Sequence, residues 1–176
     1  MSRVHPSVDI THISPCHSSR FGRKPKLIVL HATVSHNEPG LRDLRSLGNF
    51  FGTLAARASA HVATDAEGNS GRYVWDHDKA WHCRWYNSPS LGIEQVWYPG
   101  DHWAAEQIRE TARWVAYWSV KYDIPIRIGK TFGGVVTRSG VVTHRSLGRL
   151  GGGHTDPPNY PINTMIAKAK YFKSQL

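Results

Sequence analysis

Short apolar runs along the chain predict the strands of a mixed sheet. Residues 27–30 are apolar without a break, as expected of a strand buried on both faces. Residues 59–64 and 72–75 flank the turn-forming sequence Asp-Ala-Glu-Gly-Asn and predict a hairpin. Residues 90–98 predict a strand with one glutamate among apolar neighbours, and residues 141–143 predict a strand that ends at a histidine. About five short strands are therefore expected.

Three other segments repeat their apolar residues with the period of an α-helix. They lie within residues 40–56, between Asp101 and Pro125, and within residues 162–172. Asp101 is the expected N-cap of the second helix, because its carboxylate can accept hydrogen bonds from unpaired N–H groups of the first turn. Residues 1–25 show no period and are expected to be irregular, and the glycine-rich residues 126–140 give no assignment.

Together these elements predict an α/β fold with a central mixed β-sheet of about five strands flanked by about three helices. A chain of 176 residues corresponds to about one domain. We therefore expect an N-terminal arm at residues 1–26 and a single folded domain at residues 27–176. His31, Glu94 and His144 would then lie at or near strand ends of one sheet.

Composition and charge narrow the class of protein. A hydrophobic content of 40% is that of a globular chain rather than a disordered one. The formal net charge of +9 indicates an anionic partner, which leaves nucleic acid, a membrane surface or the acidic polymers of a bacterial wall. The densest basic stretch, residues 20–26, carries only four basic side chains, so the charge favours general attraction over sequence-specific nucleic-acid recognition.

Cysteine usage and the N-terminal sequence bear on metal binding and location. Cys16 and Cys83 are isolated positions, which excludes a zinc site made of cysteines alone and leaves their pairing open. The first residues lack the apolar segment of a signal peptide, and no run approaches the ~20 apolar residues of a membrane span. We expect a protein made in the cytoplasm without membrane insertion.

A candidate metal site emerges from two strand ends and one loop. His144 ends a β-branched run, and a glycine-rich loop then returns His154 and Asp156. With 11 histidines in the chain, His144 and Asp156 alone are more simply explained as a chance pair. His31, which closes the apolar run at residues 27–30, supplies a third ligand of a kind that zinc prefers. Glu94 can then direct a carboxylate at the open position, as metal-assisted hydrolysis requires.

The order of these motifs resembles a known family. The sequence contains LIVLHAT, SAHV, AWHC, SLGIEQ, VVTH and HTDPP in that order, between about Leu27 and Pro161. Each motif is weak alone, but the ordered set resembles the type 2, zinc-dependent N-acetylmuramoyl-L-alanine amidases. That family is related to the peptidoglycan recognition proteins and to the phage lysozyme-amidases.

The resemblance implies a role for several residues. His31, His144 and Asp156 match the zinc ligands, and Glu94 matches the glutamate that activates water. Other matches concern substrate binding, and they fall on His61, Trp81 and His82. For two of these the residues themselves allow a structural role, since His61 would fit a half-buried strand and Trp81 would fit a core.

One position departs from the family pattern. Two residues before the aspartate ligand many members carry a lysine that stabilises the charged intermediate, whereas this chain has His154. A protonated imidazole can donate to an oxyanion as lysine does, although its ordinary pKa is about 6.5. His154 is therefore a candidate catalytic residue, with a loop residue beside the zinc as the alternative.

The resemblance implies hydrolysis of the amide between N-acetylmuramic acid and L-alanine in peptidoglycan. A phage endolysin or its catalytic module is expected, made in the host cytoplasm as a monomer and acting on the wall after release. Cytoplasmic wall recycling is the alternative location. Two other functions stay open at this stage: a peptidoglycan-binding module without catalysis, and a basic metal-dependent nucleic-acid-binding or nuclease domain.

Overall fold

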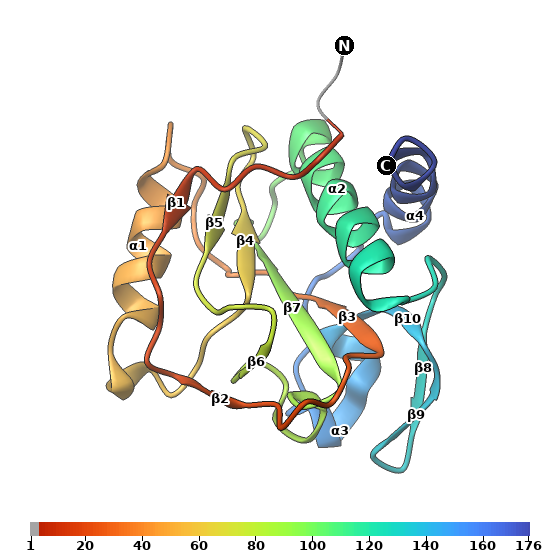
Figure 1. Ribbon diagram of the computed structural model, residues 1–176. Helices are drawn as coiled ribbons and strands as arrows, with labels where there is room; N and C mark the ends of the chain where they lie inside the picture. The colour runs from red at the N-terminus through yellow and green to blue at the C-terminus, as the bar shows by residue number, and fades with distance from the viewer. Residues whose placement is uncertain (1–3) are drawn as a thin grey trace.

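In the part of the chain that the structure describes, six strands form the central sheet. The computed structural model of the protein describes residues 4–176, and Figure 1 shows its arrangement. The elements follow the chain as β1 (Ile10–Thr11), β2 (His17–Ser19), β3 (Leu27–Leu30), α1 (Arg42–Phe51), η1 (Leu54–Ala56), β4 (Val62–Thr64), β5 (Ser70–Arg72), β6 (Asp78–Ala80), η2 (Arg84–Tyr86), β7 (Ser90–Gln95), α2 (Ala105–Tyr122), β8 (Lys130–Phe132), β9 (Val135–Arg138), β10 (Gly140–Thr143), η3 (His144–Leu147), α3 (Gly148–Gly151) and α4 (Ile162–Lys173). The strands of the central sheet lie in the order β1–β5–β4–β7–β3–β10. The predicted α/β class with a central mixed sheet is confirmed.

Parallel pairing brings the strand ends of the predicted site together. β3 lies between β7 and β10 and is parallel to both. Leu30, the last residue of β3, is opposite Ile93 on one side and Thr143 on the other. The residues that follow these three positions, His31, Glu94 and His144, therefore emerge at the same edge of the sheet.

Alternation along the strands decides on which face these side chains appear. Ile28 and Leu30 pack with α2 and α4 in the largest apolar cluster, whereas Leu27 and Val29 pack on the other face with Val142. Because successive side chains point to opposite faces, His31 falls on the face away from α2 and α4. The functional side chains thus avoid the main core.

Helices cover both faces of the sheet. α2 and α4 lie side by side on one face, where the indoles of Trp114 and Trp118 are almost fully buried (Figure 1). α1 packs on the other face, with Leu44 and Phe51 against Tyr73, which directly follows β5. Within residues 4–176, no helix is both long and apolar enough to cross a membrane.

The structure differs from the predicted elements in two places near α2. The helix begins at Ala105, and its N-cap position is Ala104, not Asp101. The Asp101 carboxylate instead accepts hydrogen bonds from the Tyr98 backbone N–H and from Asn37, so it stabilises the turn that precedes the helix. The unassigned glycine-rich residues after the helix contain the exposed hairpin of β8 and β9.

The N-terminal segment is more regular than expected. β1 pairs with β5 at the sheet edge, and β2 pairs with β6 in a separate two-stranded sheet. Arg20 is only 3% exposed, and its guanidinium donates to the backbone carbonyls of Asp78 and Ser88. This segment is therefore tied to the loop that carries Trp81 and His82. Cys16 and Cys83 are buried and unpaired with each other.

Candidate active site

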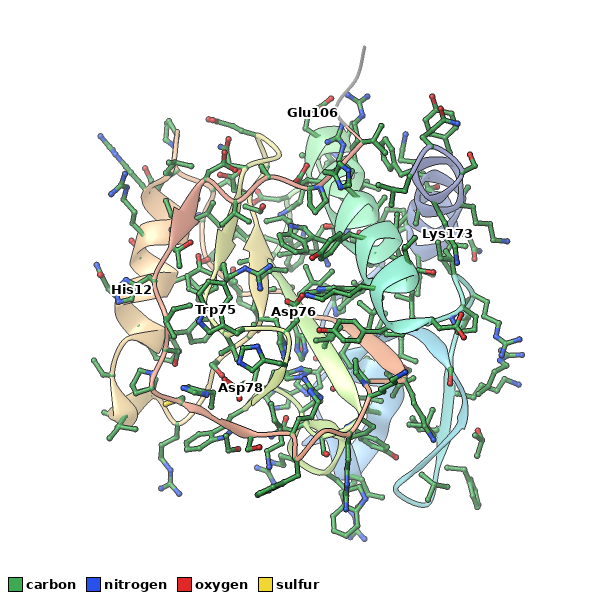
Figure 2. All side chains as sticks on the ribbon, viewed as in Figure 1. His12, Trp75, Asp76, Asp78, Glu106 and Lys173 are labelled. Atoms are coloured by element: carbon green, nitrogen blue, oxygen red, sulfur yellow. The ribbon has the colours of Figure 1, made fainter. Side chains whose placement is uncertain are left out.

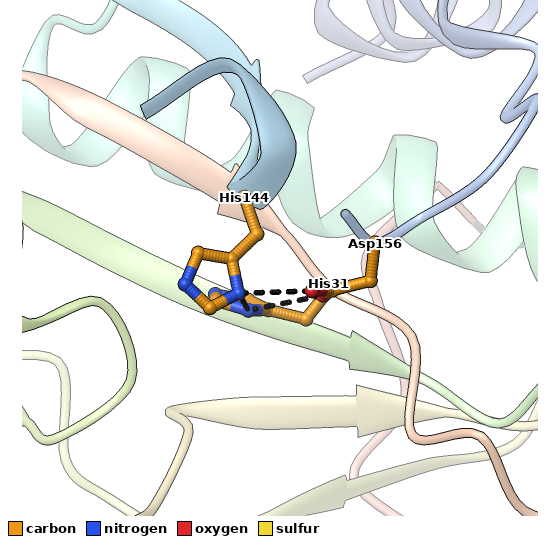
Figure 3. Close-up of side chains that lie close together, drawn as sticks. All are labelled: His31, His144 and Asp156. Atoms are coloured by element: carbon orange, nitrogen blue, oxygen red, sulfur yellow. Dashed lines mark hydrogen bonds and ion pairs between the residues drawn. The ribbon is translucent and has the colours of Figure 1, made fainter. Parts of the chain in front are cut away.

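Three side chains converge at the carboxyl edge of the sheet. The Nδ1 atoms of His31 and His144 lie 3.0 Å apart. Asp156 Oδ1 lies 3.2 Å from His144 Nδ1, and Asp156 Oδ2 lies 3.6 Å from His31 Nδ1 (Figure 3). The two imidazoles are buried and the carboxylate is half-buried. The structure thus brings together the three residues that the sequence predicts as metal ligands.

Local hydrogen bonds hold the loop of Asp156 against both strands. Asp156 Oδ2 accepts from the Ala32 backbone N–H at 3.2 Å, just after β3. The Asp156 carbonyl accepts from the Arg145 N–H at 2.8 Å, just after β10. Thr143 caps the short helix that begins at His144, since its hydroxyl accepts from the Ser146 N–H. The carboxylate is therefore positioned by the same two strand ends that carry the histidines.

The protonation of the two imidazoles suits electron-pair donation. Burial lowers the pKa of His31 to about 4, so this ring is neutral near pH 7. His144 Nε2 lies 2.9 Å from the carbonyl oxygen of Gly151. Because a carbonyl oxygen only accepts, His144 Nε2 carries a proton, and Nδ1 is the nitrogen that faces the cluster and would donate a lone pair to a metal.

These residues fit a zinc ion. Zinc in proteins takes imidazole nitrogen and carboxylate oxygen in a tetrahedron, and bonds of ~2.0–2.1 Å place neighbouring ligand atoms about 3.4 Å apart. The three separations in the cluster, 3.0, 3.2 and 3.6 Å, bracket that value. Three protein ligands leave one tetrahedral position open, as in catalytic zinc sites.

Glu94 lies in the same cavity as the cluster. The cavity has a volume of about 650 Å³ and is lined by His31, His144 and Asp156 together with Glu94. Burial raises the pKa of Glu94 to about 8, and the charge of Asp156 adds to the shift. Its buried Oε2 atom has no hydrogen-bond partner among residues 4–176. A carboxyl group with such a pKa can both accept and return a proton near neutral pH.

Trp81, which the resemblance places in a substrate groove, lines the cavity, and so does His154, the candidate catalytic residue. The Trp81 indole N–H donates to Ser18 Oγ at 3.1 Å, which fixes the ring at the wall. His154 is exposed and stacks on His144 with a centroid separation of 4.3 Å. It can therefore face a bound substrate from beside the candidate zinc ligands.

His61 and His82, the other two residues expected to bind substrate, differ in their relation to the cavity. His61 has no exposed surface and is not among the residues that line the cavity, so its role in substrate binding stays a prediction. Its Nδ1 accepts from the Gly92 N–H at 2.9 Å, so the ring is hydrogen-bonded to the backbone of β7. His82 does line the cavity, but its Nδ1 lies 2.9 Å from His31 Nε2.

Two cationic residues on the cavity wall were not predicted from the sequence. Arg57 and Arg84 both line the cavity, and both have left-handed backbone conformations, with φ of 49° and 50°. Because non-glycine residues rarely adopt such angles, the local sequence does not predict turns at these two positions. The spread of basic residues along the chain also gave no reason to single out these two.

An α/β fold with two histidines, an aspartate and a perturbed glutamate in one cavity defines a hydrolase-type site. Residues 21–159 match the family Amidase_2, described as N-acetylmuramoyl-L-alanine amidase. The chain belongs to this family and is an enzyme of the amidase class. No curated protein sequence matches the chain significantly.

Solved structures with the same fold are similarly described. Staphylococcus aureus hydrolase AmiA, in complex with its ligand, is 18% identical with a TM-score of 0.72, covering 96% of this chain and 84% of that one. The amidase LysC from Clostridium intestinale is 17% identical with a TM-score of 0.62, covering 94% and 98%. The Ph2119 endolysin from a Thermus scotoductus bacteriophage is 18% identical with a TM-score of 0.58, covering 88% and 90%. At these identities the likeness concerns the fold.

Proposed function

We propose that the protein is a zinc-dependent endolysin that cleaves the amide between N-acetylmuramic acid and L-alanine in peptidoglycan. The observation that carries this proposal is the convergence of His31, His144 and Asp156 beside Glu94 in one cavity. His31, His144 and Asp156 would hold the zinc. When bound, zinc supplies Lewis acidity toward a carbonyl oxygen and a water molecule.

Glu94 moves the proton in this proposal. With a pKa raised to about 8, it is partly ionised near neutrality and can accept a proton from the attacking water at its unpaired Oε2. The protonated acid then donates to the departing amine of L-alanine. Burial favours the protonated form of this carboxyl group, which keeps the proton available for the second transfer.

His154 supplies a second electrostatic contribution. Its exposed ring lines the cavity beside His144, so its protonated form can donate a hydrogen bond to the developing oxyanion. Arg57 and Arg84 line the same cavity and add positive potential toward the carboxylates of a stem peptide. The net charge of +9 favours approach to an anionic wall.

Membership of the amidase family supports this proposal over a binding module without catalysis and over a nucleic-acid-binding or nuclease domain. Similarity to structures described as endolysins supports action on the wall after release, with cytoplasmic wall recycling as the alternative. The monomeric state and the binding of anionic wall polymers stay predictions.

The test is product analysis on a defined muropeptide, combined with metal analysis. The native enzyme should release a peptide with a free L-alanine amino group and contain one zinc per chain. His31→Ala should lose both zinc and activity. Glu94→Gln should keep zinc and lose about 10²–10⁴-fold in turnover, the usual contribution of general acid–base catalysis.

Glu106→Gln serves as the matched control, because Glu106 is an exposed glutamate paired with Arg109 on α2. Its turnover should equal that of the native enzyme. Cleavage at a different bond, or normal turnover by Glu94→Gln, would refute the proposal. Degradation of DNA by the native enzyme would favour the nuclease alternative instead.

A further inference from the structure

A line of hydrogen bonds leads from His31 through His82 to the protein backbone. His31 Nε2 lies 2.9 Å from His82 Nδ1, and His82 Nε2 lies 3.1 Å from Ser90 Oγ. The Ser90 hydroxyl donates in turn to the Tyr86 carbonyl oxygen at 2.6 Å. The line therefore connects a candidate zinc ligand to a backbone group through two side chains.

The last group in the line fixes the direction of every bond. A backbone carbonyl oxygen can only accept, so the single Ser90 hydroxyl proton is committed to Tyr86. Ser90 Oγ must then accept from His82 Nε2–H, which leaves His82 Nδ1 without a proton. That nitrogen accepts from His31 Nε2–H. A proton is therefore held on His31 Nε2, and His31 Nδ1 is the nitrogen that faces His144 and Asp156.

The loop and strand around His82 are built to hold this ring. The His82 N–H donates to Asn87 Oδ1 at 2.9 Å, which fixes the backbone that carries the imidazole. The ring lies directly over Gly92 of β7, where an added Cβ would be 2.7 Å from His82 Nδ1. The absence of a side chain at Gly92 thus leaves the space that the ring occupies.

We propose that His82 is a positioning residue that sets the tautomer and ring orientation of His31 for zinc binding. This role is separate from the substrate contact expected from the sequence, and it presupposes the proposed binding of zinc by His31. Partners that fix the tautomer of a metal-binding histidine are typically worth about 10–100-fold in metal affinity. His82 therefore acts through His31 and does not itself touch zinc or the scissile bond.

The experiment measures the zinc dissociation constant of metal-free protein by competition with a chromophoric chelator. His82→Leu removes the acceptor and should weaken zinc binding by about 10–100-fold. His82→Asn and His82→Gln separate the role in orientation from one in filling space. The amide of asparagine reaches the place of Nδ1 and can accept from His31, whereas that of glutamine reaches the place of Nε2.

The asparagine variant should therefore recover most of the zinc affinity, while the glutamine variant should remain as weak as the leucine variant. His77→Leu is the control, because it removes an imidazole that is 76% exposed and outside the cavity. Its zinc affinity should equal that of the native protein. Gly92→Ala keeps His82 but displaces its ring, so it should weaken zinc binding even if the leucine variant fails to fold.

Native zinc affinity in the leucine, glutamine or Gly92→Ala variants would overturn the proposed role of His82. A loss in the asparagine variant as large as that in the leucine variant would do the same. In both cases tight binding by the native protein would leave the proposed function intact. Failure of the native protein to bind zinc would overturn the proposed function and the role of His82 together.

Discussion

Replacing Asp76 tests how much a buried ion pair contributes to the stability of the fold. Its carboxylate is 4% exposed and pairs with Arg72 Nη1 at 2.7 Å and with Lys121 Nζ at 2.9 Å. These two ion pairs link the end of β5 to the last turn of α2. Asp76 itself, labelled in Figure 2, lies just before the segment that carries Trp81 and His82. Asp76→Asn removes the negative charge with little change in shape.

The expected cost follows from the burial of each partner. Removing one partner of a buried ion pair costs about 3–5 kcal/mol, because the other charge stays buried. Arg72 is only 8% exposed and carries most of this effect, whereas the half-exposed Lys121 is screened by water and adds little. The asparagine oxygen can still accept one hydrogen bond, so a loss of about 3 kcal/mol is expected. For a chain of this length that lowers the Tm by about 6–12 °C.

The pH dependence gives an independent check. Burial would by itself raise the pKa of Asp76, but Arg72 and Lys121 outweigh it and hold this pKa below its ordinary value. The ionised carboxylate therefore contributes stability above the unfolded pKa of about 3.9, and this contribution is lost as the pH falls through the folded pKa. The difference in Tm between the native protein and Asp76→Asn should narrow below pH ~4.

Thermal unfolding followed by circular dichroism, in the presence of a chelator, measures both effects. Glu106→Gln is the control, since it removes a carboxylate from a solvent-exposed pair with Arg109 worth about 0–1 kcal/mol. A Tm change for Asp76→Asn no larger than that of the control would refute the reasoning. So would a difference that stays constant down to pH 3.

Three further predictions concern the site and the sheet. His154→Ala should keep its zinc and lose about 10²–10³-fold in turnover, as for a lost oxyanion donor, and His154→Lys should recover most of it; unchanged turnover in the alanine variant would make His154 a loop residue. Free zinc at about 100 times its Kd should stabilise the native protein by about 2.7 kcal/mol in chemical unfolding, with no effect on His31→Ala. Gly140→Ala should destabilise the protein by about 1–3 kcal/mol, because the backbone has a φ of 151° and the new Cβ would lie 2.3 Å from the Arg127 carbonyl oxygen; an unchanged unfolding midpoint would contradict this.

The sequence predicts the site well where side chains follow strands of one sheet. His31, Glu94 and His144 each come at the end of an apolar run, and parallel pairing of neighbouring strands is enough to bring such residues together. Asp156 could be added because the glycine-rich loop before it returns toward the same edge. Short-range pattern and sheet geometry therefore carry most of this prediction.

The contacts that were not predicted from the sequence depend on the paths of irregular segments. The contact between His82 and His31 depends on how residues 78–87 fold across β7, and no periodicity describes that path. The burial of His61 depends on the N-terminal segment, whose Arg20 covers the same region and whose strands pair with distant partners. The hairpin of β8 and β9 has no fully buried residue. Its sequence therefore lacks the alternation of apolar and polar residues that marks a strand with one buried face.

The close approach of His82 to Gly92 has a consequence for how this family can vary over evolution. A residue larger than glycine at position 92 is compatible with the fold only if the ring at position 82 moves or is lost. The two positions should therefore change together among related amidases: glycine should be retained wherever histidine is retained. Lineages that have replaced the histidine by a small residue should be free to accept alanine or serine on the strand.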